Sequence, residues 1–321
     1  MSKKNSNVPS LKDILRENKK ILEIYLSFKF RLEKIINKKS FVVGVSGGPD
    51  SMALTALSKM YQYEKKTKVY FVLIDHGIRS NSRLESNLVK KILSKRKIVL
   101  KVIRNKEKIK NNIQNKARTV RYRLLTEYCK KKKTKFILTG HHSDDQIETF
   151  LIRLSRGSGI QGLSSMSKMT ELNKNIKLVR PLLDFKKKDL VFVAKKIFGK
   201  FIKDPSNKNI KYLRTKMRHL KKELEKSGIY HDQIIRSISN LASTRDTLNI
   251  YLEKVMKSCV IKKRSETIIN LKKLSSESNE IKLKTLGYAI RDFSNGYYPP
   301  RSKKILNALT RLNTKKIVKL T

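Results

Sequence analysis

The chain has 321 residues, and its 76 Lys and Arg against 26 Asp and Glu give a formal net charge of +50. This balance excludes an acidic, self-solvating protein and favours a polyanionic partner, while 39% hydrophobic residues suffice for a core in about two domains. The basic residues comprise 56 Lys and only 20 Arg, a bias that an A/T-rich coding sequence also produces on any solvated surface. The charge alone therefore does not decide between RNA binding and composition.

The two cysteines, Cys129 and Cys259, lie too far apart in the sequence for a CxxC metal or redox pair and give no disulfide framework. The first residues lack the apolar segment of a secretory signal, and the longest apolar runs are of strand length. We therefore expect a cytoplasmic protein. Its oligomeric state stays open, with a homodimer as one arrangement.

The first half of the chain alternates between strand and helix patterns. Residues 1–36 are charged and helix-prone, which indicates a helical N-terminal extension. Further predicted elements follow in order: a strand over 41–45 with a helix after it, a strand over 69–75, a helix over 85–95, a strand over 98–103, a helix over 111–131, a strand over 135–139 and a helix over 143–155. This alternation predicts an α/β fold with a doubly wound parallel sheet.

The second half is more helical. Residues 156–159 resemble a polar loop, and Arg180–Leu183 precede a helix that runs to about 198. Residues 204–207 have turn composition, because Asp and Asn favour turns and Pro fixes φ. Beyond about 220 only 267–271 suggests an extended segment. We expect a catalytic domain over 37–218 and a mainly helical domain over 225–321.

The segment Ser46–Ser51 follows the first predicted strand and opens a helix. Gly47 and Gly48 let backbone N–H groups approach an anion, and the helix N-terminus favours phosphate. The GxxxxGK[ST] pattern of a Walker loop is absent. Asp50 would repel phosphate unless a cation lies between them, so we predict a Mg²⁺ ligand; the alternative is an ordinary first-turn helix acid.

A second polar segment covers 139–149. Ser143 and Gln146 have the spacing of a capping box, which predicts a helix start at Ser143. His141 and His142 precede this helix, and Asp144 and Asp145 open it. The helix dipole explains the two acids but not the paired histidines, and adjacent histidines lack the spacing of a zinc helix. Asp144 and Glu148 are expected to share a face.

Two arginine pairs also recur at helical spacing. Arg118 and Arg121 are separated by three positions, and Arg214 and Arg218 by four. Arginine forks suit phosphate or base-edge recognition. For any single arginine, a solvated basic face is the simpler interpretation.

The ordered motifs resemble the tRNA(Ile)-lysidine synthetase family of the N-type ATP pyrophosphatases, also called PP-loop enzymes. These motifs are SGGPDSMAL (46–54), DHGIR (75–79), QNKARTVRYRLL (114–125), TGHHSDDQIET (139–149), RLSRGSGIQGLSSM (153–166), RPLL (180–183) and DPSN…LRTKMR (204–218). The SGGxDS motif alone indicates only the superfamily. The GHHxDDQxET motif followed by RGSGxxGL restricts the resemblance to this family. Residues 297–301 resemble the end of a helical tRNA-binding domain, and the further terminal domain of longer members is not expected.

The resemblance implies a definite reaction. ATP adenylates the C2 oxygen of the wobble cytidine, C34, in the CAU anticodon of tRNA(Ile), and pyrophosphate leaves. The ε-amine of free L-lysine then attacks C2 and displaces AMP, which gives lysidine. ATP and Mg²⁺ are the implied cofactors.

The resemblance also assigns residues. The implied catalytic residues are Asp50, His141, Asp145 and Arg118, with the division of roles between His141 and Asp145 left open. The implied nucleotide-binding residues are Ser46, Gly47, Gly48, Asp50, Ser51, Asp75 and His76. Arg121, Asp144, Glu148, Arg214 and Arg218 are expected to contact lysine or tRNA.

Three alternatives remain beside this reading. A tRNA thiolase of the same superfamily would use cysteines, often as CxxC pairs, which this chain lacks. A GMP- or asparagine-synthetase-like enzyme would need an ammonia source, and the chain has no spare domain for one. An RNA-binding protein without activity would not need Asp50, the paired histidines and Asp145.

Overall fold

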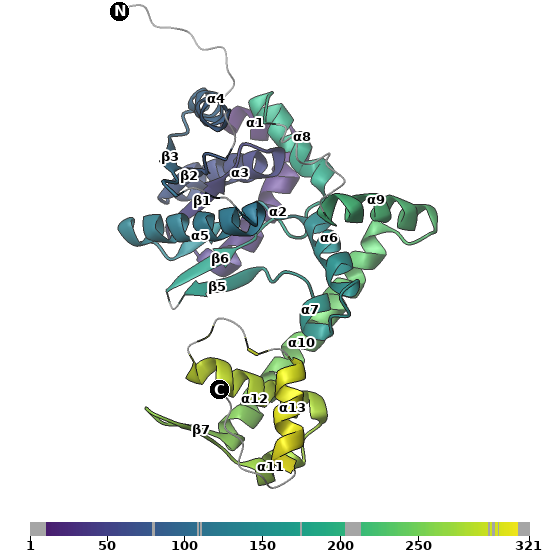
Figure 1. Ribbon diagram of the computed structural model, residues 1–321. Helices are drawn as coiled ribbons and strands as arrows, with labels where there is room; N and C mark the ends of the chain where they lie inside the picture. The colour runs from purple at the N-terminus through teal and green to yellow at the C-terminus, as the bar shows by residue number, and fades with distance from the viewer. Residues whose placement is uncertain are drawn as a thin grey trace, which may run out of the picture. The chain divides into compact units, whose positions relative to one another are not determined.

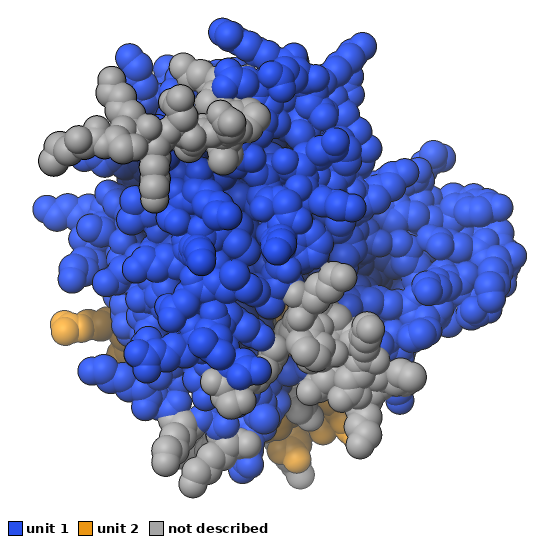
Figure 2. All heavy atoms as spheres, turned by 90° about the horizontal axis from the view of Figure 1, so that it is seen from above, with its two compact units in different colours: residues 1–238 blue, residues 239–321 orange. Residues whose placement is uncertain are grey.

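The computed structural model describes residues 11–78, 81–107, 109, 111–173, 175–202, 213–294, 296, 299–300 and 302–313. The chain divides into two compact units, Met1–Ile238 and Ser239–Thr321, which Figure 2 colours blue and orange. The division falls inside helix α10 (His231–Cys259). The domain boundary expected between 218 and 225 stays a prediction. None of the helices in the described ranges has the length and apolar character needed to cross a membrane.

Unit 1 is built on a six-stranded sheet of order β3-β2-β1-β4-β6-β5 (Figure 1). The strands are β1 (Phe41–Val45), β2 (Val69–Asp75), β3 (Leu100–Arg104), β4 (Phe136–Leu138), β5 (Met169–Asn173) and β6 (Ile176–Val179). Every pair among β3, β2, β1, β4 and β6 is parallel, and only β5 is antiparallel. The predicted parallel α/β sheet is therefore confirmed, and its strands end at one common edge.

Helices cover both faces of this sheet because each strand alternates its side chains. Phe41 and Val43 of β1 join one hydrophobic cluster, and Val42 joins another. The first cluster includes residues of α1 (Leu11–Glu17), α2 (Lys19–Ile36), α3 (Pro49–Lys65), α4 (Ser82–Ser94) and α8 (Lys187–Phe198). The second includes Leu125 and Cys129 of α5 (Ile113–Lys131). The packing on both faces thus holds the carboxyl ends of the strands in place, and ligands bind at these ends in such folds.

The hairpin of β5 and β6 was not expected from the sequence. β6 lies beside β4 inside the sheet, where Lys177 faces Phe136 in register. Its four residues are too short for a periodic signal, and β5 alternates exposed and half-buried side chains as an edge strand does. At the end of β5, the Asn173 side chain accepts hydrogen bonds from the N–H groups of Asn175 and Ile176.

The end of unit 1 is helical. The helices are α6 (Ser143–Leu154), α7 (Ile160–Leu163), α9 (Leu213–Lys226) and the first part of α10. Ile147 and Leu151 of α6 pack with Ile234 and Ile238 of α10 in a separate small core, against which Met217 of α9 also packs. The turn predicted at 204–207 lies outside the described residues.

Unit 2 has its own core, which includes Leu252, Val255, Ile281 and Leu286. Its elements after α10 are β7 (Val260–Lys262), β8 (Thr267–Ile269), α11 (Leu271–Ser275), α12 (Asn279–Phe293) and α13 (Ser302–Asn313). β7 and β8 form an antiparallel pair, which matches the extended segment expected near 267. The mainly helical character predicted for this part of the chain agrees with the described elements.

Candidate active site

The loop between β1 and α3 is folded tightly onto itself. The Ser51 hydroxyl donates to the carbonyl of Gly48 (3.0 Å) and accepts from the backbone N–H of Ser46 (3.1 Å). Gly47 has φ +83°, and a Cβ there would lie 2.7 Å from Val89. Only glycine therefore fits position 47. With proline at the start of α3, the loop leads into a helix N-terminus, a geometry that suits phosphate binding.

A cavity of about 620 Å³ opens at the carboxyl edge of the sheet, beside this loop. It is lined by the ends of β1 and β2 and by the residues that follow β4. The strand order reverses between β1 and β4, and such a point is the usual ligand site of open α/β sheets. The predicted site residues that line it are Ser46, Gly48, Asp50, Ser51, Asp75, His76, Arg121, His141 and Arg214. Its volume is suitable for a nucleotide. The structure thus gathers residues from five separate motifs around one space.

Asp50 lies at the floor of this cavity in the first turn of α3. Its Oδ1 is buried and has no hydrogen-bond partner in the described part of the chain, whereas Oδ2 lies 3.5 Å from His142 Nε2. Gly140 approaches from the end of β4 so closely that a Cβ there would lie 2.9 Å from the Asp50 carbonyl oxygen. This close approach brings the histidine segment against the phosphate-binding loop.

His142 is a buried residue that the sequence analysis did not single out for a role. Its Nε2 lies 3.5 Å from both Asp50 Oδ2 and Asp145 Oδ2, and its Nδ1 lies 3.8 Å from Asp144 Oδ2. Burial alone would lower the pKa of His142, but the three surrounding carboxylates outweigh burial and raise it above its ordinary value. The ring therefore separates acids that would otherwise repel one another.

Helix α6 begins at Ser143, as predicted, but the predicted Ser143–Gln146 capping box is wrong. The N-cap is His142, whose backbone N–H donates to Asp145 Oδ2 (3.0 Å). The Ser143 hydroxyl instead donates to the Phe185 carbonyl (2.8 Å), and the Gln146 amide bonds the backbone of Met166. The Ser143 and Gln146 side chains bond to partners that are distant in sequence instead of to the helix end. The local spacing therefore predicted the correct first residue of the helix but not the residue that caps it.

His141 and His76 both face the cavity. Burial and the charges of Arg180 and Arg118 hold the pKa of His141 well below its ordinary value. Burial, aided by Arg121, lowers the pKa of His76 to about 4. Both imidazoles are therefore neutral near pH 7. His141 Nδ1 lies 2.9 Å from the Thr139 hydroxyl.

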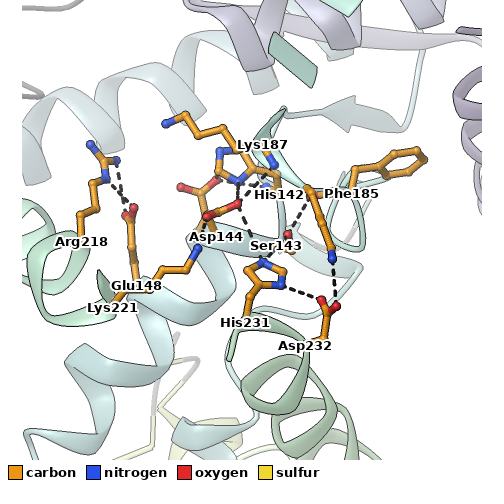
Figure 3. Close-up of polar contacts among 12 residues, drawn as sticks. His142, Ser143, Asp144, Glu148, Phe185, Lys187, Arg218, Lys221, His231 and Asp232 are labelled. Carbon is orange, nitrogen blue, oxygen red and sulfur yellow. Dashed lines mark hydrogen bonds and ion pairs between the residues drawn. The ribbon is translucent and has the colours of Figure 1, made fainter. Parts of the chain in front are cut away.

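Asp144 and Glu148 do not line the cavity but face helix α9, which Figure 3 shows. Arg218 Nε lies 2.5 Å from Glu148 Oε1, and Lys221 Nζ lies 2.5 Å from Asp144 Oδ1. The second Asp144 oxygen accepts from the Lys187 N–H (3.2 Å). Burial opposes the charged form of Asp144, yet these donors lower its pKa below the ordinary value.

His231, the first residue of α10, also lies beside Ser143 and Asp144 (Figure 3). Its Nε2 lies 3.1 Å from the Ser143 hydroxyl and 3.9 Å from Asp144 Oδ2. Its Nδ1 lies 2.9 Å from Asp232, whose carboxylate can only accept, so Nδ1 carries a hydrogen. Sequence reasoning missed His231 and Lys221, because their partners lie more than seventy positions earlier in the chain.

The predicted arginines are spread around the cavity. Arg121 and Arg214 line it, whereas Arg118 is exposed and its guanidinium lies 4.9 Å from the centre of the Tyr122 ring. Asp75 ends β2, is buried, and accepts from the Gly77 N–H (3.0 Å). No group of three His, Cys, Asp or Glu suited to a metal ion occurs among the residues that the structure describes. Asp50 thus remains a single candidate ligand.

Comparisons with known proteins agree with this site. Residues 17–224 match the PP-loop domain family. The chain is 34% identical over 300 residues to the tRNA(Ile)-lysidine synthase of Wolbachia pipientis wMel, covering 89% of this chain and 68% of that protein. It is 40% identical over 183 residues to that of Orientia tsutsugamushi (strain Boryong), covering 57% and 41%. The chain thus spans about two thirds or less of the length of these relatives.

A solved structure supports the fold. The U34-tRNA thiolase NcsA from Methanococcus maripaludis, with its [4Fe-4S] cluster, matches with a TM-score of 0.59 and 19% identity, covering 70% of this chain and 79% of that chain. This likeness concerns the fold alone. The family match and the curated relatives together show that the chain belongs to the tRNA(Ile)-lysidine synthase family of ATP-using PP-loop enzymes.

Proposed function

We propose that this chain ligates L-lysine to C2 of the wobble cytidine, C34, in the CAU anticodon of tRNA(Ile). ATP first adenylates the C2 oxygen and releases pyrophosphate. The lysine ε-amine then forms a bond to C2, the C–O bond to AMP breaks, and the nitrogen loses a proton. The observation that carries this proposal is the cavity that joins the phosphate-binding loop to the His141 segment. A cytoplasmic reaction accords with the tRNA substrate.

The loop at 46–51 suits the pyrophosphate group. The folded Ser46–Ser51 turn and the N-terminus of α3 offer backbone N–H groups and hydroxyls to a polyanion. Arg121 and Arg214 line the same cavity and can stabilise the charge that develops on the α-phosphate. Arg118, outside the lining, suits the RNA backbone, because it is exposed and stacked on Tyr122.

The site fits a Mg²⁺ ion at Asp50. Its buried Oδ1, without a hydrogen-bond partner in the described part of the chain, is a carboxylate oxygen of the kind that Mg²⁺ prefers. Phosphate oxygens would supply further ligands, because Mg²⁺ is often held by one or two carboxylates plus substrate phosphates. When bound, the ion would neutralise phosphate charge. The other carboxylate oxygen of Asp50, Oδ2, faces the His142 ring.

Removal of the lysine proton falls to His141 or Asp145. Free lysine has an ε-ammonium with a reference pKa of about 10.4, so a base must accept a proton before attack. His141 lines the cavity and is neutral near pH 7 because its pKa is lowered by burial and neighbouring arginines. Asp145 lies behind His142 and suits attraction of the cationic amine. We therefore favour His141 as the base and Asp145 as an electrostatic partner.

Asp144 and Glu148 would contribute to lysine binding only after an exchange of partners. Each already holds an ion pair with a cation of α9, Lys221 or Arg218. A substrate ammonium would need to replace those cations. Asp145 lies 3.5 Å from His142 Nε2 and is the third acid of this motif, which suits it to attract a cationic substrate.

A thiolase reaction finds no support in the two cysteines. Cys129 and Cys259 are both buried, and burial raises the pKa of Cys129 to about 12. Such a thiol is not a ready nucleophile. The likeness to the U34-tRNA thiolase therefore remains one of fold.

The test is the substrate requirement for pyrophosphate release by the purified chain. We expect steady release only when ATP, L-lysine and a tRNA(Ile) with a CAU anticodon are all present. Replacing C34 by U34 in the same tRNA is the matched control and should abolish release. Turnover that continues without lysine, or with the U34 tRNA, would refute the proposed specificity.

A further inference from the structure

Lysine is concentrated at the amino-terminal edge of the sheet, opposite the candidate active site. Because β1, β2, β3 and β4 are parallel, the loops that lead into them share this edge. These loops are 37–40, 66–68, 95–99 and 132–135. Ten of their sixteen residues are Lys or Arg and none is Asp or Glu, against 76 Lys and Arg among 321 residues in the whole chain. We call these ten residues the basic rim: Lys38, Lys39, Lys66, Lys68, Lys95, Arg96, Lys97, Lys132, Lys133 and Lys135.

The loops at the other ends of the same strands provide an internal comparison. The segments 46–48, 76–81, 105–112 and 139–142 follow β1, β2, β3 and β4. Only four of their twenty-one residues are Lys or Arg. A bias of coding composition would act on both edges alike. The basic rim therefore exceeds the lysine-rich composition of the chain.

Hydrogen bonds join three of the four loops of the rim, 37–40, 66–68 and 132–135. The Thr67 hydroxyl donates to the Lys38 carbonyl (2.8 Å), and the Thr134 hydroxyl donates to the Ser40 carbonyl. The Lys177 N–H of β6 donates to the Lys135 carbonyl (2.8 Å). All nine lysines of the rim are exposed, whereas Arg96 is half-buried and donates to the Ile197 carbonyl. The surface thus presents lysine point charges on a fixed backbone.

Each of the four loops also holds one lysine in the left-handed backbone region. Lys38, Lys66, Lys97 and Lys133 have φ of 61°, 51°, 54° and 51°. Glycine and asparagine adopt this conformation most readily. Lysine occurs at all four positions in spite of that preference. A hollow of about 320 Å³ lies beside the last of them, lined by Lys130, Lys133 and Lys135 among others.

We propose that the basic rim binds the sugar-phosphate backbone of RNA, without sequence preference and separately from the active site. Adjacent strands lie about 4.8 Å apart, so the rim extends over roughly 14 Å, which matches a chain of phosphates better than one anion. Lysine ammonium groups suit phosphates, whereas base reading favours arginine and amide forks. Val99 is the one exposed apolar side chain in the four loops. A single exposed apolar side chain offers too little apolar area for insertion into a lipid surface.

The test removes one charge from each loop without opposing the backbone. A quadruple variant carries Lys38→Asn, Lys66→Asn, Lys97→Asn and Lys133→Asn, because asparagine tolerates the left-handed region. The control removes the same charge from exposed lysines elsewhere in unit 1, as Lys19→Gln, Lys90→Gln, Lys116→Gln and Lys222→Gln. Binding of an arbitrary double-stranded RNA oligonucleotide and of phosphatidylserine vesicles is measured against salt concentration.

We expect the rim variant to bind the RNA roughly tenfold more weakly than the control variant at about 0.1 M salt. The slope of log binding constant against log salt concentration should be smaller in magnitude by about 2 to 3 than that of the control. The rate of lysine ligation at saturating tRNA should equal that of the control, so this result is independent of the proposed reaction. Equal RNA affinity of the two variants would overturn the proposal. So would a loss confined to the vesicles, which would assign the rim to a membrane surface.

Discussion

Asp50 is the residue on which the proposed chemistry depends most. Its carboxylate lies among phosphate-binding groups, with one buried oxygen lacking a hydrogen-bond partner in the described residues and the other facing His142. Sequence spacing was enough to predict Asp50 and the serine–glycine loop, because these residues are contiguous. It did not reveal His142 as the ring that separates three acids, since that role depends on the fold around it.

The Asp50→Asn variant should lose lysine ligation while binding tRNA(Ile) with near wild-type affinity. The amide keeps the shape of the side chain but removes the charge that would hold a cation beside the phosphates. Single-turnover formation of the adenylate and a tRNA filter-binding assay measure the two properties. A marked loss of tRNA affinity would show that Asp50 supports the RNA site instead.

Arg218→Met should destabilise unit 1 by about 2 kcal/mol, because it leaves the buried Glu148 carboxylate without its cation. Urea unfolding of the single variant measures this loss. Adding Glu148→Gln to Arg218→Met should restore part of it, since the neutral amide tolerates burial better. Lys222→Met, from an exposed position of the same helix, is the control and should be nearly neutral. If the double variant recovers none of the lost stability, the Arg218–Glu148 ion pair is not the cause of the loss.

The elements of unit 1 follow from local patterns to different degrees. Strands β1 and β2 have the predicted limits, because long apolar runs between turn residues are strong signals. The hairpin of β5 and β6 escaped prediction because its strands are short and one is half exposed. The junction of α6 with α9 and α10 also escaped it, because the ion pairs that form it join distant segments.

Helix α2 is fastened to the segment after β6 by Asp184, and this contact should depend on pH. Burial opposes the charged carboxylate, but Arg31 (3.0 Å) and Lys168 (3.1 Å) hold the pKa of Asp184 below its ordinary value. The charged form therefore stabilises the fold above the unfolded-state pKa of about 4, and the contribution is lost as pH falls through the lower folded-state value.

Urea unfolding of wild type and of Asp184→Asn at several pH values measures this dependence. The wild type should be the more stable at pH 7, and the difference should shrink below about pH 4. Glu127→Gln, an exposed position of α5, should show no such trend. A difference that is constant with pH would indicate that Asp184 acts through packing and not through charge.

For the whole molecule, the net charge of +50 has more than one origin. Arg121 and Arg214 line the cavity at the carboxyl edge, and lysines gather in the loops at the amino edge. The remaining lysines are scattered and accord with composition. The motifs identified the family, and the fold brings residues from five of them to one cavity. Neither could be read from charge alone, because surface lysines carry little information about position in the fold.

The central claim is that this chain, although it spans about two thirds or less of its curated relatives, joins lysine to C34 through the ε-nitrogen. The most direct test incubates the purified chain with ATP, tRNA(Ile) and L-lysine labelled with ¹⁵N at the ε position, then digests the tRNA to nucleosides for mass spectrometry. We predict one labelled lysine on the nucleoside from position 34, with AMP released in equal amount. AMP release with unmodified cytidine at position 34, or lysine attached through its unlabelled α-nitrogen, would contradict the account.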